Sequence, residues 1–303
     1  MSEETTFLNR AEGMGLEVQD LGRYRYEDEF GEVIYRQLTT MDGIAIPFLG
    51  VFVKSAEATN QSLAGIVSDH YQFVGNTDAI NKIKESIADI GSPIFTEHTL
   101  ISHAGAQMYH EIVIRNQTSV PSVGDIYPQL IVTNGYNGTR AINVSFGISI
   151  YNEQRKRLLG FGFRKFGNMR QIHMKNAKTR LSSAIGSYVN TFGEGIMSMI
   201  EANMNSRLTE DDFLKTLELV EGIGKRRRES VSMIIESISE KDSEDQKVIT
   251  RWNLFHAITR FSSIEKNINT RLLLENAAER CLVFPTEMDN VLKQVRAAQR
   301  RTT

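Results

Sequence analysis

Residues 154–193 contain nine Lys and Arg residues and not a single Asp or Glu. The strand-like part of this segment also holds Phe161, Phe163 and Phe166. Binding of a nucleic acid needs cations that replace the condensed counterions, and single strands also offer bases that stack on aromatic rings. The segment therefore combines the two side-chain chemistries that a single-stranded nucleic acid requires.

The rest of the chain does not share this charge. Residues 1–153 hold 9 Lys and Arg against 19 Asp and Glu, a net charge of −10, and residues 194–303 hold 17 against 18, a net charge of −1. With the +9 of residues 154–193, these values give the formal net charge of −2. A nearly neutral total thus hides a strong separation of charge, which bears on binding partners rather than on the fold.

The basic segment predicts a cationic loop, a strand over 158–166 and a helix whose apolar stripe begins near Met174. Alternate residues of a strand share one face, so Phe161 and Phe163 are expected to project together. Gly160 and Gly162 leave the opposite face bare for a ligand or another backbone. The expected phosphate contacts are Arg155, Lys156, Arg157, Arg164, Lys165, Arg170, Lys175, Lys178 and Arg180, and the expected base-stacking residues are Phe161 and Phe163.

A second candidate phosphate site follows the turn Gly222-Ile223-Gly224, where Lys225, Arg226, Arg227 and Arg228 come in succession. The stretch resembles a degenerate helix-hairpin-helix, in which a glycine turn presents backbone N–H groups to a phosphate. The alternative is a helix that ends at glycine and is followed by a new helix. Four cations in the first turn of a helix oppose its dipole, which favours a bound anion.

Catalytic and metal-binding patterns are weak. His98, His103 and His110 lie near Glu97 and Glu111, but spacings of five and seven suit neither one helix face nor a compact metal site. The sequence holds no Walker A, G-x-S-x-G or H-E-x-x-H string. We expect no catalytic residues, no metal and no cofactor, and a protein that is not an enzyme.

The predicted fold class is α+β, with an antiparallel β-meander and packed helices followed by an all-helical C-terminal part. Period-two patterns predict strands at 24–26, 32–39, 44–53, 94–102, 109–115, 130–133, 141–151 and 158–166. Helical periodicity predicts helices at 77–90, 174–193, 194–205, 210–220, 225–239, 248–261, 265–282 and 285–298. The two predicted domains are residues 1–193, with the basic hairpin and helix, and residues 194–303.

Three local features refine these elements. Asn76 or Thr77 is the expected N-cap of the helix over 77–90, and Gly91 is expected to end it. Pro47 implies that its strand lies at an edge or contains a bulge. The pairs Asn134-Gly135 and Asn137-Gly138 suit positive φ angles in the turn between two strands.

The composition of the whole chain predicts the cellular location of the protein. No apolar run reaches the ~18 residues that span a bilayer, and the polar N-terminus is typical of neither a signal nor a transit peptide. Cys281 is the only cysteine, which excludes intrachain disulfides. These features predict a cytoplasmic protein without a membrane partner, in the host cytoplasm if a phage encodes it.

Several short motifs carry a resemblance to a known family. They are Asp69-His70-Tyr71-Gln72-Phe73-Val74, Val123-Gly124-Asp125, the stretch Thr133 to Thr139, Arg170-Gln171-Ile172-His173, and the stretch Thr250 to Thr259 around Trp252. Over residues 65–285 the chain resembles the phage- and plasmid-like proteins grouped as a domain of unknown function. This resemblance implies a mobile-element origin and supplies no catalytic residue. The order of meander, basic hairpin and long helix is similar to the plan of Rad52-like single-strand annealing proteins, a fold-level analogy.

These observations predict a phage or plasmid DNA-metabolism protein that binds single-stranded nucleic acid, with DNA favoured, and acts as a homo-oligomer in strand annealing. The alternative is a protein-interaction module whose basic segment docks on an acidic host protein or on the acidic part of a second copy. A third possibility leaves the phenylalanines in the core and the charges on a solvated face.

Overall fold

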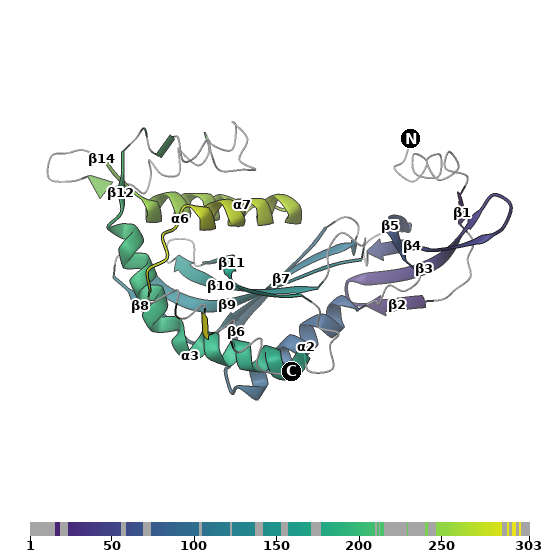
Figure 1. Ribbon diagram of the computed structural model, residues 1–303, viewed down its shortest axis with the longest axis horizontal. Coiled ribbons are helices and arrows are strands. Elements are labelled where there is room, and N and C mark those ends of the chain that lie inside the picture. The colour runs from purple at the N-terminus through teal and green to yellow at the C-terminus, as the bar shows by residue number, and fades with distance from the viewer. Residues whose placement is uncertain are drawn as a thin grey trace.

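The computed structural model describes residues 16–18, 24–55, 59–68, 74–102, 105–121, 123–136, 142–152, 157–170, 177–209, 211, 213–214, 229, 240–241, 247–286, 290, 293–294 and 297. A small N-terminal sheet lies at one end of the long axis, and a larger antiparallel sheet lies between two layers of helices (Figure 1). In the described part of the chain, no helix combines the length and the apolar character needed to cross a membrane.

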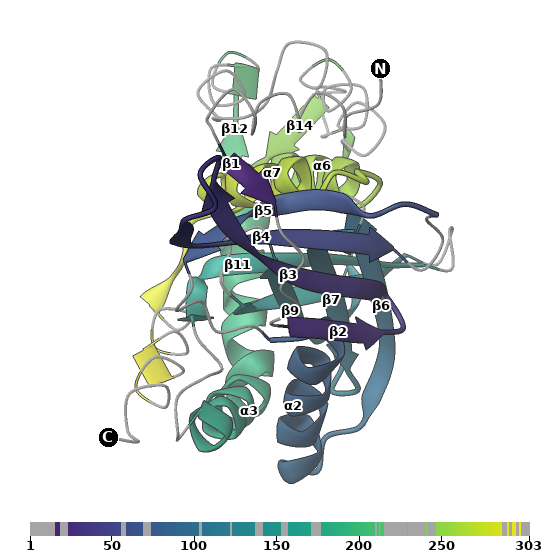
Figure 2. The same cartoon turned by 90° about the vertical axis from the view of Figure 1, so that its right-hand side faces the viewer.

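The N-terminal sheet faces the viewer in Figure 2. Its strands are β1 (Leu16–Val18), β2 (Tyr24–Asp28), β3 (Gly31–Thr40), β4 (Ala45–Ser55) and β5 (Ser62–Ser68), in the order β1-β3-β4-β5, with β2 also paired to β3. The predicted hairpin around Glu29-Phe30-Gly31 is confirmed as β2 and β3. Its inner face buries Val33, Tyr35, Val51 and Val53 in a small core that also includes Tyr136.

Pro47 lies at a bulge, as one of the two sequence alternatives predicted. Strand β4 lies between β3 and β5 and is therefore not an edge strand. The register between β3 and β4 shifts between Gln37 and Thr39. The buried Gln37 amide donates hydrogen bonds to the carbonyl oxygens of Ile46 and Phe48 and so replaces ladder bonds that the bulge removes.

The larger sheet contains β6 (Ile94–Ser102), β7 (Gln107–Ile114), β8 (Thr118–Val120), β9 (Gly124–Gly135), β10 (Asn143–Asn152) and β11 (Arg157–Arg170). Its order is β11-β10-β9-β7-β6, and β8 pairs with β9. The predicted meander over 130–166 is confirmed as β9, β10 and β11, and the strands predicted at 94–102 and 109–115 are β6 and β7.

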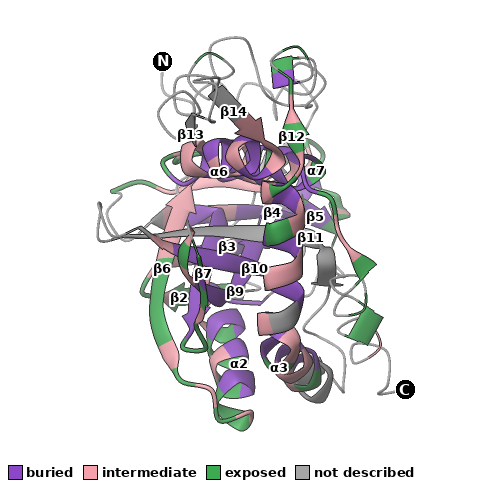
Figure 3. Cartoon of the chain, turned by 90° about the vertical axis from the view of Figure 1, so that its left-hand side faces the viewer, coloured by how far each residue is buried: buried purple, intermediate pink, exposed green. Residues whose placement is uncertain are grey.

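Helices α2 (Asn76–Asp89) and α3 (Ala177–Met204) cover one face of this sheet. Figure 3 shows buried residues concentrated in the strands and on the inner sides of these helices. Phe146 of β10 packs edge-on against Tyr188 of α3 with ring centroids 5.1 Å apart. Gly91, with φ of +68°, follows the end of α2 as predicted, because a left-handed residue there favours glycine.

Helix α3 corrects the prediction of two helices that meet near Gly193. It runs without a break through Gly193 and Gly195, and the predicted boundary between residues 193 and 194 lies inside it. The reason is tertiary packing: Phe192, Ile196 and Ile200 continue the buried stripe across the glycines. Such burial outweighs the ~1 kcal/mol that each glycine costs a helix.

The opposite face of the sheet carries α6 (Arg251–Ser262) and α7 (Ile268–Arg280). Short strands β12 (Arg207–Leu208), β13 (Glu240–Lys241) and β14 (Lys247–Thr250) form a third sheet beside them. The α+β class with helices toward the C-terminus is confirmed, and these three strands are an addition to it. The helix predicted from Val248 starts at Arg251, because Thr250 forms a capping box with Asn253.

Three of the other predicted helices fall mainly outside the described residues. These are the helices predicted at 210–220, 225–239 and 285–298, of which only isolated residues such as Phe213, Glu229 and Lys293 are described, each as helical. The helix predicted at 265–282 is confirmed as α7, with Asn267 as its N-cap.

The N-terminus of α2 is capped by side chains from β2 and from the end of β9, and not by its own side chains. Gly75 is the N-cap, so the prediction of Asn76 or Thr77 is wrong. The Asn76 N–H donates to the Tyr136 hydroxyl at 2.8 Å, and the Thr77 N–H donates to the Asp28 carboxylate at 3.4 Å. A carboxylate at this end also complements the helix dipole. The helix start therefore joins the two sheets.

A single glycine position tests this junction. A Cβ atom at Gly75 would lie 2.1 Å from the ring of Tyr26, which is held beside Asp28 and Thr77. Gly75→Ala is expected to lower the unfolding free energy by about 1–3 kcal/mol, because Tyr26 must leave these contacts. Urea denaturation followed by circular dichroism measures the change.

Gly186 within α3 is the matched control. A Cβ atom there meets Ile90 at an ordinary 3.5 Å. Gly186→Ala is therefore expected to raise the unfolding free energy by about 0.5–1 kcal/mol. Equal destabilisation by the two substitutions would contradict the close contact between Gly75 and Tyr26.

Candidate functional site

The described residues of the basic segment lie on β11, at one edge of the larger sheet, and on α3. Strand β11 is the last strand in the sheet order, and α3 begins at Ala177. Arg155, Lys156, Lys175 and the second cluster Lys225, Arg226, Arg227 and Arg228 lie outside the described residues. For Arg157, Phe161, Phe163, Arg164, Lys165, Arg170, Lys178 and Arg180 the description is limited to the backbone. The structure thus places the eight described positions on one edge strand, β11, and one helix, α3.

Strand β11 is longer than predicted and leaves the ladder in its middle. Phe163 pairs with Phe146, but the next partner of β10, Ser145, pairs with Asn168. The four residues between them, Arg164 to Gly167, therefore have no partner on β10. Such irregularities are frequent at sheet edges and next to functional sites, where they redirect side chains. Two of the predicted phosphate contacts, Arg164 and Lys165, occupy this excursion.

The register also bears on the two predicted base-stacking residues. Phe161 pairs with Ile148 and Phe163 pairs with Phe146. Both partners are fully buried on the face of the sheet that packs against α2 and α3. Because directly paired positions share one face of a sheet, core packing competes with base stacking as the role of Phe161 and Phe163.

The glycines of β11 pair with small residues on the other face. Gly160 pairs with Ser149, and Gly162 pairs with Gly147. Helices α6 and α7 both contact β11. A second backbone thus approaches the glycine strand, which is one of the two outcomes that the glycine spacing predicted.

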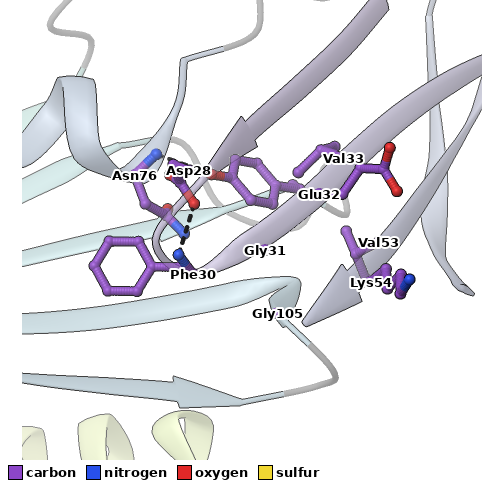
Figure 4. A pocket seen from close by; sticks show the side chains of 10 residues that line it. Asp28, Phe30, Gly31, Glu32, Val33, Val53, Lys54, Asn76 and Gly105 are labelled. Carbon is purple, nitrogen blue, oxygen red and sulfur yellow. Dashed lines mark hydrogen bonds between the residues drawn. The ribbon is translucent and has the colours of Figure 1, made fainter. Parts of the chain in front are cut away.

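A recess lies where the N-terminal sheet meets α2, and Figure 4 shows the residues that line it. They include Asp28, Phe30, Glu32, Lys54, Asn76 and Tyr136, around a cavity of about 10 Å³ that is partly open to solvent. Sites for small organic ligands usually enclose about 300–1,000 Å³. The Asp28 carboxylate already accepts a hydrogen bond from the Phe30 N–H at 2.9 Å. The recess is therefore better explained as part of the junction than as a ligand site.

Two family-like motifs meet at this recess. The Asn134 amide donates hydrogen bonds to the Val74 carbonyl at 3.1 Å and to the Asn76 side chain at 2.9 Å. Asn134 and Gly135 lie within β9, so their predicted role as turn residues with positive φ is wrong. The reason is that these bonds satisfy a buried amide, which a turn residue in solvent does not need. Asn137 and Gly138 lie outside the described residues.

A buried ionic network joins α7 to the sheet, and sequence analysis missed it. Arg271 donates hydrogen bonds to Glu275, at 3.2 Å, and to Glu111 of β7. The Tyr109 hydroxyl donates to Glu275 at 2.6 Å, and the Arg271 guanidinium lies 4.3 Å from the centroid of the Tyr109 ring. The i,i+4 spacing of Arg271 and Glu275 is visible in the sequence, but it is also typical of exposed helix pairs.

The network contains groups with strongly shifted pKa values. Burial raises the pKa of Glu275 to about 7, against the opposing effect of Arg271 and of the hydrogen bond from Tyr109. Burial also raises the pKa of Tyr109 well above its usual value, with a further contribution from Glu275. A buried charge without its partner is costly, so this network fixes the position of α7 on the sheet.

The histidines of β6 and β7 lie on opposite faces of the sheet. On one face, His98 Nδ1 lies 3.7 Å from Glu111. On the other face, the His110 ring shares a 2.7 Å hydrogen bond with the Thr99 hydroxyl. Its other ring nitrogen lies 3.3 Å from Glu97 without hydrogen-bond geometry. Burial lowers the pKa of His110 to about 4, so its ring is neutral at pH 7. Within the described ranges no three His, Cys, Asp or Glu side chains converge as metal ligands, and His103 lies outside those ranges.

The raised pKa of Glu275 predicts a pH effect on stability. The folded protein keeps a proton that the unfolded chain releases near pH 4.5, so this contribution is complete below pH 4.5 and is lost as the pH rises through 7. Glu275→Gln removes the titration. The unfolding free energy of the variant relative to the wild type should therefore rise by the order of 1–3 kcal/mol between pH 5 and pH 8.

Urea denaturation at both pH values measures this difference. His110 and His256, whose pKa values burial lowers to about 4, act in the opposite direction in both proteins and cancel in the comparison. Parallel pH profiles for the wild type and Glu275→Gln would show that Glu275 titrates normally.

Comparison with known proteins identifies a family but no activity. Residues 64–279, more than two thirds of the chain and the whole span from β5 to the last turn of α7, match the family described as Domain of unknown function (DUF932). No curated protein and no solved structure matches the chain. The match agrees with the predicted resemblance to a domain-of-unknown-function family. The chain therefore belongs to the DUF932 family.

Proposed function

We propose that the protein binds single-stranded nucleic acid, with DNA favoured, through residues 154–193. On this proposal the phosphates contact the cations of β11, of the loop before it and of the start of α3. The protein acts in phage or plasmid DNA metabolism, and the activity that binding serves is annealing of complementary strands. It requires no cofactor.

The observation that carries the proposal is the excursion of Arg164 to Gly167 from an edge strand within an acid-free segment. A sheet edge leaves one side of β11 without a neighbouring strand among the described residues. Residues that leave the ladder there are displaced from the regular positions that pack between the layers. Nine cations without one acid along 40 residues supply the charge that phosphates attract.

The annealing role rests on analogy. The meander β9-β10-β11 leads directly into the 28-residue helix α3, which is similar in order to the plan of Rad52-like annealing proteins. The family-like motifs imply a mobile-element origin, in which such proteins are common. Fold-level analogy supports a role less strongly than a site does, so binding and annealing are tested separately.

Charge-driven binding predicts a defined salt dependence. The affinity of the protein for a labelled oligothymidylate should fall with salt at a slope near −0.7 per neutralised phosphate on a log–log plot. Arg164→Gln together with Lys165→Gln should reduce the magnitude of that slope by about 1.4, because two contacts disappear. Fluorescence anisotropy at four or more salt concentrations measures both slopes.

The matched control replaces Lys82 and Arg207, two exposed cations outside the segment, by glutamine. It removes the same charge and should leave the slope unchanged. A flat slope in the wild type, or an equal loss in the control, would contradict the proposal. Salt-sensitive self-association without affinity for the oligonucleotide would favour the alternative, in which the basic segment docks on an acidic protein surface.

Base stacking by Phe161 and Phe163 is a separate prediction. Each stacked base contributes about 1–3 kcal/mol, so Phe161→Leu and Phe163→Leu should each weaken oligonucleotide binding about fivefold or more. A leucine keeps most of the apolar volume, so urea denaturation should show a loss of stability below about 1.5 kcal/mol. Loss of stability with unchanged affinity would instead assign both rings to the core beside Ile148 and Phe146.

Annealing is measured by mixing two complementary oligonucleotides that carry a fluorophore and a quencher. The wild type should accelerate quenching, and the variant with Arg164→Gln and Lys165→Gln should lose acceleration in parallel with affinity. Binding without acceleration would remove annealing from the proposal while leaving nucleic-acid binding in place.

A further inference from the structure

One end of the larger sheet carries an exposed aromatic ring outside the basic segment. Phe95 is 39% exposed and belongs to β6, the edge strand opposite β11, which is exposed along much of its length (Figure 3). Ile94 and Thr96 pair with consecutive residues of β7, so Phe95 between them is the extra residue of a bulge. A bulge bends its strand and redirects a side chain, and here it sets Phe95 apart from the regular alternation of β6.

The Phe95 ring lies flat on the ring of Tyr127, and these two residues are here called the aromatic platform. The ring centroids are 5.0 Å apart, and the ring planes differ by 1°. Tyr127, on β9, is buried, and its hydroxyl donates a hydrogen bond to the Gln117 side chain at 3.0 Å. Because Tyr127 covers one face of the Phe95 ring, the exposed surface of Phe95 lies on its other face and its edge.

Arg115, directly after β7, places a cation beside the platform. Its guanidinium lies 5.5 Å from the centroid of the Phe95 ring, near the outer limit of about 6 Å for a cation–π contact. Arg115 is exposed, and among the residues that the structure describes its guanidinium forms no ion pair and no hydrogen bond. The nearby Asp125 carboxylate accepts a hydrogen bond from the Ser119 hydroxyl at 2.5 Å. Arg115 can therefore contact an anion next to Phe95.

A flat ring beside an unpaired cation suits a nucleotide better than a protein surface. The residues that follow Phe95 on β6 are exposed and polar, namely Thr96, Glu97 and His98, and Glu97 is paired with Lys84 of α2. A stable protein interface buries about 800 Å² per partner, far more than one phenyl ring offers. A nucleotide instead presents a flat base for stacking and a phosphate for an arginine.

The platform lies at the end of the sheet where β11 begins. Asn152 of β10 and Arg157 of β11 are paired at this end, where the basic segment enters the sheet. Tyr127 pairs with Ser149 of β10, three residues before Asn152. In the order β9-β10-β11, Tyr127 is two strand spacings, or about 10 Å, from β11. One bound strand can therefore reach both the start of the basic strand and the platform.

Tyr151 lies between the platform and β11. It is half-buried on β10 and pairs with Leu158 of β11. Because Ser149 pairs with Tyr127 and lies two residues before Tyr151, the two tyrosines share one face of the sheet. Burial raises the pKa of Tyr127, with further contributions from Asp125 and from Tyr151, as expected of close neighbours. Aromatic side chains of β6, β9 and β10 thus follow one another across the sheet toward β11.

We infer that the aromatic platform is a base-stacking site for single-stranded nucleic acid, in which a base stacks on the open face of Phe95 and Arg115 contacts an adjacent phosphate. This inference rests on the proposed function and adds to it a site outside residues 154–193. The bound strand passes from the start of β11 over Tyr151 to Phe95. The bases of a duplex stack on one another, so the platform selects unpaired bases.

The first test measures the affinity of the full-length protein for a labelled oligothymidylate by fluorescence anisotropy. Phe95→Leu should weaken binding about fivefold or more with an unchanged salt slope, because it removes a stacked base but no phosphate contact. Phe48→Leu is the matched control, at a phenylalanine 44% exposed on the N-terminal sheet, and should bind like the wild type. Arg115→Gln should reduce the magnitude of the salt slope by about 0.7, and its control Arg207→Gln should not.

The second test uses Phe95→Trp as a direct probe of stacking. Its indole keeps a flat ring, so the variant should bind like the wild type, and its emission should be quenched when the oligothymidylate saturates the protein. Trp252 is the only tryptophan of the wild type and is buried, so the wild type supplies the background signal. The same oligonucleotide annealed to its complement should leave the emission of Phe95→Trp unchanged.

Wild-type affinity in Phe95→Leu, an unchanged salt slope in Arg115→Gln, or unquenched emission of Phe95→Trp would each overturn the inference. If binding then still depends on Arg164 and Lys165, the proposed function stands without the platform, whereas a wild type that does not bind removes both. A change in molar mass of Phe95→Leu without nucleic acid, at unchanged affinity, would assign the ring to a protein contact instead. Circular dichroism confirms that each variant is folded.

Discussion

The structure depends on covering both faces of one antiparallel sheet. Strands β7, β9 and β10 lie in its middle, and most of their residues are buried, so neither face can remain in water. One face is apolar and packs on α2 and α3. The other also carries polar and charged side chains such as Tyr109 and Glu111, and it is covered by α7 through hydrogen bonds to Arg271 and Glu275 as well as through Ile268. The C-terminal helices supply this second covering layer, which is why the chain continues with helices after the strands of the sheet.

Much of the fold was predictable because strand alternation and helical periodicity are local. Helices α2, α6 and α7 and most strands between β2 and β11 were found within a few residues. Strand β9 was predicted too short, and β5 and β8 were missed. Errors occurred where tertiary contacts overrode a local pattern. The sequence around Gly193 predicts a helix end, but buried neighbours continue α3 through it. Asn134-Gly135 predicts a turn, but hydrogen bonds to Val74 and Asn76 hold it in a strand. Such contacts join residues that are distant in the sequence, so they produce no periodic pattern in it.

The candidate sites show the same difference between features that the local sequence predicts and features that depend on tertiary contacts. A charge count along the chain locates the basic segment, because it needs no knowledge of the fold. The excursion at Arg164 to Gly167 and the pairing of Phe161 with Ile148 depend on the register between two strands, which the spacing of residues does not fix. The network around Arg271 was missed for a similar reason: an Arg-Glu pair four residues apart has the same sequence whether it is exposed or, as here, almost fully buried. Membership of the DUF932 family delimits residues 64–279 as the family domain without adding an activity.

The excursion in β11 has a consequence for how the molecule behaves in a concentrated solution. An exposed edge strand normally offers an unbroken row of backbone donors and acceptors, on which a strand of another molecule can add and start a fibril. Four residues that leave the ladder interrupt that row between Phe163 and Asn168. A foreign strand can then match only the shorter stretches on either side, the seven residues from Arg157 to Phe163 and the three from Asn168 to Arg170. The same irregularity that sets Arg164 and Lys165 apart thus protects the protein against aggregation through its own sheet edge.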